Sequence, residues 1–152
     1  MLALIGLSEY TPFSFSRVRE PYVRRLLAKR AIMVLAVTVL TSLDSNALSE
    51  IGLDPNIARQ ARRFANMANQ AGLRGLVCSP LEVAELRQAL PVSMQFVTPG
   101  VRLEASPDDD QRRTLSPRDA LAAGANWLVI GRPIYAAPDP RAAADAILNS
   151  LG

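Results

Sequence analysis

Two arginines and a glycine follow short apolar segments of the chain, and together they have the chemistry of a phosphate site. Gly131 and Arg132 come directly after the segment 127–130, and Arg102 follows the segment 95–98 after a Pro-Gly pair. A guanidinium presents a planar fork of donors that matches phosphate oxygens, and a glycine lets a backbone N–H approach them closely. The alternative is that both arginines are solvated surface charges and that Gly131 only ends its segment. The spacing alone gives these two interpretations equal weight.

Two further polar residues have side chains that suit a ligand. Gln111 can supply an amide to a sugar, a base or a phosphate, and it lies in the polar stretch 102–114. Structureless stretches of this length in compact domains are usually functional or mobile. Thr41, which precedes Ser42, follows the apolar run 31–40 and can offer a hydroxyl to a ligand. The residues alone favour a different role for this pair, which is to cap the next segment.

The composition excludes several other kinds of site. The 152 residues include no histidine, which excludes His-based acid–base catalysis, a Ser-His-Asp triad and any zinc site that needs histidine. The single cysteine, Cys78, excludes an internal disulfide framework and indicates a buried structural thiol. Asp108–Asp110 can bind a cation, but a mobile acidic loop is the favoured interpretation.

The segments that would position these residues alternate between strand and helix. Apolar runs typical of buried strands occupy 31–40, 75–78, 95–98 and 127–130. Helix starts follow at Asp54-Pro55, Ser79-Pro80, Ser116-Pro117 and Asp139-Pro140. This order predicts an α/β fold with a parallel sheet, in which the first strand is buried on both faces. Four such βα units are half of a (β/α)8 barrel, which typically needs about 250 residues.

Residues 1–32 do not fit this alternation. Six basic and two acidic residues give 1–30 a net charge of +4, whereas 11 arginines and 12 acidic residues give 31–152 a net charge of −1. We expect an irregular leader with room for one short basic helix over 21–29. This segment has few aromatic residues and no nucleic-acid-binding motif, so no nucleic-acid partner is expected. No convincing export or membrane segment occurs, so a cytoplasmic location without a membrane partner is expected.

Five segments, in order and at fitting spacing, resemble the bacterial type of the orotidine 5'-phosphate decarboxylase family. They are LAVTVLTS (35–42), GLVCSPLEV (75–83), FVTPGVR (96–102), DQRRTLSPRDALAAGANWLVIGRP (110–133) and DPRAAADAI (139–147). The resemblance implies that 33–152 are strands five to eight of a (β/α)8 TIM barrel, its C-terminal half, with 1–32 as a leader outside it. It implies a homodimeric carboxy-lyase of pyrimidine biosynthesis that converts orotidine monophosphate to uridine monophosphate and CO2 without cofactor or metal. The substrate-binding residues that it implies are Thr41, Arg102, Gln111, Gly131 and Arg132.

The resemblance does not extend to the family's catalytic segment. That segment is a DxKxxD motif on the third strand, which supplies the proton-donating lysine between aspartates. The only lysine here, Lys29, lies in AKRAI without a nearby aspartate, so no catalytic residue carries over. We expect a truncated family member that keeps the phosphate- and nucleotide-binding side but is doubtful as an isolated enzyme. The alternative is a non-catalytic nucleotide-phosphate-binding or interaction module that needs a separate N-terminal half. The open strand edges of half a barrel also predict association or aggregation.

Overall fold

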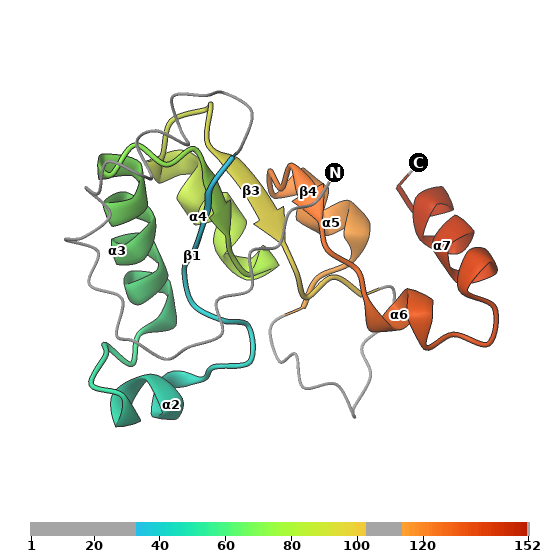
Figure 1. Ribbon diagram of the computed structural model, residues 1–152, viewed down its shortest axis with the longest axis horizontal. Helices are drawn as coiled ribbons and strands as arrows, with labels where there is room; N and C mark the ends of the chain where they lie inside the picture. Colours follow the sequence, from blue (N-terminus) through green and yellow to red (C-terminus); the bar gives the residue numbers. More distant parts are fainter. Residues whose placement is uncertain (1–32, 103–113, 152) are drawn as a thin grey trace.

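The computed structural model describes residues 33–102 and 114–151, which form a parallel sheet flanked by helices (Figure 1). The four strands pair in the order β1 (Leu35–Val37), β2 (Gly75–Val77), β3 (Gln95–Thr98) and β4 (Trp127–Leu128). The helices are α2 (Ser45–Glu50), α3 (Ile57–Gln70), α4 (Pro80–Ala89), α5 (Pro117–Ala122), α6 (Arg132–Tyr135) and α7 (Pro140–Asn149). The predicted parallel α/β sheet of four βα units is confirmed. None of the helices in these ranges has the length and apolar character needed to cross a membrane.

Side-chain caps and prolines start three helices where the sequence predicts them. Ser79, Ser116 and Asp139 each accept a backbone N–H at the start of α4, α5 and α7, and a proline follows each of them. A capping oxygen satisfies one of the N–H groups that a helix start leaves without a partner, and proline has the backbone angle that the first turn needs. These caps fix where each helix leaves the sheet.

The predicted start of α3 at Asp54 is wrong by two residues. Asn56 is the cap, and its side chain accepts the N–H of Arg59 at 2.9 Å. Asp54 accepts the N–H of Asn56 at 2.9 Å instead and also pairs with the Arg59 guanidinium. Asparagine caps a helix as well as aspartate does, so the sequence offered two caps and the local turn selected the second.

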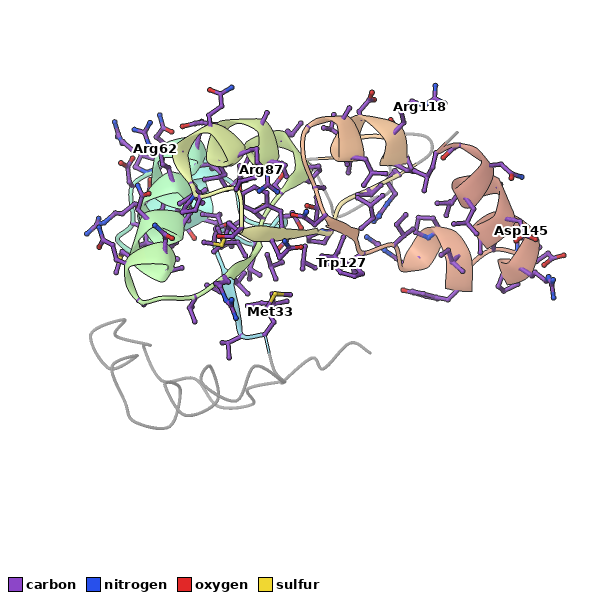
Figure 2. The ribbon with its side chains drawn as sticks, turned by 90° about the horizontal axis from the view of Figure 1, so that it is seen from above. Met33, Arg62, Arg87, Arg118, Trp127 and Asp145 are labelled. Carbon is purple, nitrogen blue, oxygen red and sulfur yellow. The ribbon has the colours of Figure 1, made fainter. Side chains whose placement is uncertain are left out.

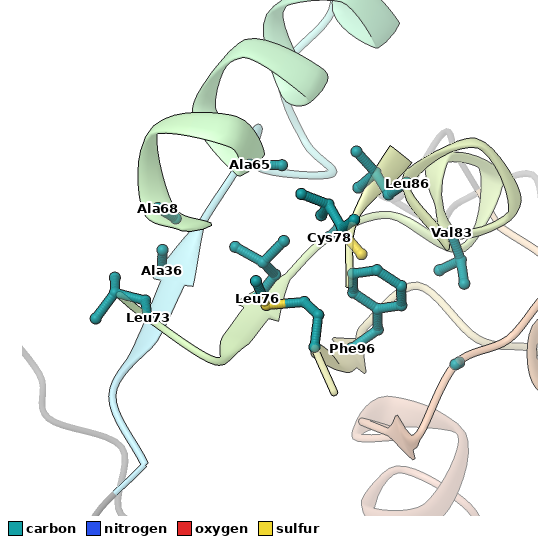
Figure 3. Packing of buried hydrophobic residues seen from close by; sticks show 12 residues of the cluster. Ala36, Ala65, Ala68, Leu73, Leu76, Cys78, Val83, Leu86 and Phe96 are labelled. Carbon is teal, nitrogen blue, oxygen red and sulfur yellow. The ribbon is translucent and has the colours of Figure 1, made fainter. Parts of the chain in front are cut away.

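The core lies between one face of the sheet and α3 and α4. Ala36, Leu76 and Phe96 are neighbours in the strand register and all point to this face. They pack against buried side chains of the two helices (Figure 3). These side chains are Ala65, Ala68, Val83 and Leu86.

The opposite face of the sheet is only partly covered. Val37, next in the chain after Ala36, is 47% exposed, although it lies within β1. The prediction that the first strand is buried on both faces is therefore wrong. The apolar, β-branched composition of this strand resembles that of a fully buried strand. However, α4 and α5 both lie on one side of the sheet, so these helices do not cover its other face (Figure 2).

Candidate functional site

The candidate ligand residues lie along one edge of the sheet. Because all four strands are parallel, their carboxyl ends share that edge, which is where α/β folds place their sites. Arg102 follows β3, and Gly131 and Arg132 follow its neighbour β4. Thr41 follows β1, which lies three inter-strand spacings of ~4.8 Å from β4. The topology thus brings Arg102, Gly131 and Arg132 together and places Thr41 at the other end of the same edge.

The backbone at Arg102 is held by a short parallel bridge between Val101 and Leu115. The Arg102 N–H donates to the Leu115 carbonyl at 3.0 Å, and the Leu115 N–H donates to the Gly100 carbonyl at 3.4 Å. Gly100 has a φ of 78°, a left-handed conformation that favours glycine. The Arg102 side chain is half-buried, and its Nη1 donates to the Val101 carbonyl at 2.9 Å. The arginine is therefore fixed at the carboxyl edge, while Gln111 lies outside the described residues, as do Asp108–Asp110.

Gly131 and Arg132 begin a helix that the sequence analysis missed. The Gly131 carbonyl accepts the N–H of Ile134 at 2.9 Å and the N–H of Tyr135 at 3.1 Å, which closes the first turn of α6. The pattern Gly-Arg-Pro was interpreted only as the end of a strand. Pro133 in the first turn was the available signal, because proline is favoured where a helix starts. Gly131 is exposed and Arg132 is half-buried, so the backbone at this turn can be reached by a ligand.

The expected capping role of Thr41 and Ser42 is wrong. Asp44 caps α2, and its Oδ1 accepts the Ala47 N–H at 2.9 Å. Thr41 lies instead in the turn between β1 and α2 and is 8% exposed, whereas Ser42 is exposed. The ligand-contact hypothesis for Thr41 therefore stays a prediction.

A buried polar cluster just inside the carboxyl edge was not predicted. Thr38 Oγ1 lies 3.2 Å from the Val77 carbonyl and 3.5 Å from Glu82 Oε2, and the Glu82 side chain is buried. Burial raises the pKa of the nearby Cys78 thiol to about 12, and the Glu82 charge acts in the same direction. A thiol held neutral in this way is a poor nucleophile. The prediction that Cys78 is buried is confirmed.

Comparison with known proteins extends this description. A family model described as "Orotidine 5'-phosphate decarboxylase / HUMPS family" matches residues 16–147. The orotidine 5'-phosphate decarboxylase of Opitutus terrae is 52% identical over 120 residues, which are 79% of this chain and 52% of that protein. That of Pseudomonas putida (strain W619) is 50% identical over 131 residues, 84% of this chain and 56% of that protein. The chain spans about half the length of these curated relatives.

A solved structure gives the same coverage. The crystal structure of orotidine 5'-phosphate decarboxylase from Lactobacillus acidophilus superposes with a TM-score of 0.64 at 36% identity, covering 79% of this chain and 49% of that one. The four βα units are therefore part of a (β/α)8 barrel. The family match begins at residue 16, inside the segment 1–32, so the boundary at residue 32 stays a prediction.

Proposed function

The chain belongs to the orotidine 5'-phosphate decarboxylase / HUMPS family, and we propose that it forms the part of the barrel that binds the phosphate of orotidine or uridine monophosphate. The observation that carries this proposal is the position of Arg102, Gly131 and Arg132 after the neighbouring strands β3 and β4. The loops after the last two strands of such barrels frequently bind phosphate. The residue types and the fold thus both favour a phosphate group as the ligand.

Each of these residues has a distinct part in the proposed site. The guanidinium groups of Arg102 and Arg132 neutralise the phosphate and donate to its oxygens. The exposed turn at Gly131 lets the backbone approach the same group. A nucleotide with its phosphate at this end extends its sugar and base along the edge toward Thr41. Gln111 is assigned a further substrate contact on the resemblance alone.

Binding without turnover is the activity that we assign to the isolated chain. Phosphate contacts supply binding energy at a distance from the reacting carbon, whereas charge stabilisation at that carbon is usually the largest catalytic contribution. In the family, by resemblance, a lysine between aspartates provides this charge, and Lys29 has no nearby aspartate. Decarboxylation therefore needs a further half that carries the catalytic strand. The same proposal includes a cytoplasmic location, a homodimeric state and no nucleic-acid or membrane partner.

Calorimetric titration of the full chain with uridine monophosphate and with uridine tests this function. We expect the nucleotide to bind at least tenfold more tightly than the nucleoside, because only the nucleotide carries the phosphate. Arg132→Ala should weaken nucleotide binding about 10- to 100-fold, which corresponds to one charged hydrogen-bond partner. Arg74→Ala is the matched control, since Arg74 is an exposed arginine that precedes β2 at the amino edge. Equal affinities for the two ligands, or equal losses in the two variants, would contradict the proposal.

A further inference from the structure

A row of polar side chains crosses three strands just inside the carboxyl edge of the sheet. Thr38, Cys78 and Thr98 continue the register in which β1, β2 and β3 pair, and all three are buried. Their side chains lie on the face that packs against the helices, where Cys78 is part of the core (Figure 3). The sheet is still hydrogen-bonded at this level, because the Thr38 N–H donates to the Val77 carbonyl at 3.0 Å.

Glu82 brings a carboxylate to this row from the first turn of α4. Its N–H donates to the Ser79 carbonyl at 3.0 Å, so the start of the helix fixes its backbone. The Glu82 side chain is buried, whereas its neighbour Leu81 is 53% exposed. This is the reverse of the arrangement that burial of apolar surface favours. Local departures of this kind are expected where a residue serves function, so the carboxylate deserves a functional explanation.

The carboxylate meets the end of β1. Thr38 Oγ1 lies 3.5 Å from Glu82 Oε2 and 3.2 Å from the Val77 carbonyl oxygen. A hydroxyl has one proton, so Thr38 shares it between an acceptor on α4 and an acceptor on β2. Thr38 is therefore joined to both neighbouring elements at the point where the chain leaves the sheet.

The segment that follows Thr38 leads directly to the candidate ligand residue Thr41. Val39 is buried in a small apolar cluster with side chains of α2 and α3. The Leu43 N–H donates to the Leu40 carbonyl at 3.0 Å, which closes the turn that contains Thr41. The position of this turn thus depends on where Thr38 is held.

We propose that Glu82 is a positioning residue for nucleotide binding, which holds Thr38 and thereby the turn that carries Thr41. The inference rests on the proposed function, in which the phosphate binds at Arg102 and Arg132 and the base extends toward Thr41. Glu82 acts through Thr38 and does not touch the ligand, because it lies on the helix-packed side of the sheet. The two arginines follow β3 and β4, so loss of the carboxylate affects the base end of the site and not the phosphate end.

Calorimetric titration of the full chain with uridine monophosphate and with ribose 5-phosphate tests this inference, because only the first ligand carries a base. Glu82→Leu should weaken binding of uridine monophosphate about 3- to 10-fold, an effect of the size of one hydrogen bond. Its affinity for ribose 5-phosphate should be unchanged. Glu82→Gln keeps an oxygen acceptor and should bind uridine monophosphate within about twofold of the unmodified chain. Glu85→Leu is the matched control, since Glu85 is an exposed glutamate of the same helix, and neither affinity should change.

Thr38→Val gives the same test from the strand. It removes the hydroxyl with little change in volume, and the same selective loss of uridine monophosphate affinity is expected. The double variant Thr38→Val, Glu82→Leu should lose no more affinity than either single variant, because both remove one interaction. Losses that add in the double variant would contradict a role of Glu82 through Thr38.

Three further results would overturn the inference. They are equal losses for both ligands in Glu82→Leu, unchanged uridine monophosphate affinity in that variant, and a Glu82→Gln variant that binds as weakly as Glu82→Leu. Circular dichroism checks folding, and Thr38→Val decides by the same comparison if Glu82→Leu does not fold. An unmodified chain that binds both ligands equally well also overturns the inference but leaves the phosphate site standing. An unmodified chain that binds neither ligand contradicts the proposed function itself.

Discussion

The guanidinium carbon of Arg87 lies 4.1 Å from the centroid of the Phe96 ring, which sets a cation of α4 against a core residue of β3. The same guanidinium donates to the Met94 carbonyl at 2.8 Å, to the Gly124 carbonyl at 2.7 Å and to Asn126 Oδ1 at 2.7 Å. Asn126 Oδ1 also accepts the Phe96 N–H at 2.8 Å. One side chain therefore joins α4, the start of β3 and the loop before β4, at the edge opposite the candidate site.

Replacement of Arg87 by alanine should destabilise the fold more than replacement of any exposed arginine. Several charge-assisted hydrogen bonds and a cation–π contact are lost together, and we expect the free energy of unfolding to fall by about 2–4 kcal/mol. Urea unfolding followed by circular dichroism measures this loss. Arg62→Ala is the control, because Arg62 is exposed and its pair with Glu85, at 3.4 Å, should contribute less than about 1 kcal/mol. Similar losses in the two variants would show that the Arg87 contacts do not stabilise the sheet.

Much of this fold could be predicted from short-range patterns. The segment 95–98 is the third strand to the residue, and Ser79 and Ser116 cap helices as predicted. Apolar runs and caps are local signals, so one sequence suffices to find them. The end of β4 was misjudged because the segment 127–130 is apolar throughout, whereas the strand itself ends at Leu128.

The candidate site was predicted only in part, for a different physical reason. Position after a strand identified Arg102 and Arg132, since parallel strands share one carboxyl edge. The polar contact between Thr38 and Glu82 joins residues 44 positions apart, and no spacing rule connects them. The exposure of Val37 depends on what lies over the sheet, which the composition of one strand does not encode.

The Cys78 thiol should make stability depend on pH in the alkaline range. Its pKa in the folded chain is about 12, against an ordinary value of 9.0, so above pH 9 the unfolded chain binds fewer protons than the folded chain. Stability from this group is therefore complete below pH 9 and is lost as pH rises toward 12. The expected slope is up to about 1.4 kcal/mol per pH unit. This slope can be measured by urea unfolding at, for example, roughly pH 8.0, 9.5 and 10.5.

Cys78→Ala separates this effect from the titration of other groups. The variant should lose stability at neutral pH, because a buried side chain becomes smaller, but its stability should fall less steeply above pH 9. Parallel pH profiles for the two proteins would mean that the thiol ionises equally in both states.

Gly131→Ala should separate ligand binding from folding. The backbone φ of −106° is not a left-handed conformation that requires glycine, and the added Cβ would lie 3.4 Å from Tyr135 Cε1, an ordinary contact. We expect a stability change below about 1 kcal/mol but at least a tenfold loss of uridine monophosphate affinity, because the methyl group occupies space beside the turn. Gly75→Ala is the control with the opposite expectation for stability. Its Cβ would collide with the Leu35 side chain, so this variant should destabilise the pairing of β1 with β2. Unchanged nucleotide affinity in Gly131→Ala would remove this turn from the site.

The full chain should not decarboxylate orotidine monophosphate, although it should bind the nucleotide. We assign the arginines to the phosphate, which the ribose separates from the carboxyl group on the base, and phosphate binding alone does not stabilise charge at the reacting carbon. The measurement is the absorbance loss of orotidine monophosphate with purified chain, with Arg132→Ala and with buffer. We expect the same background rate in all three. Turnover well above buffer would show that this chain itself supplies the catalytic charge, and Lys29→Met would then test whether Lys29 provides it.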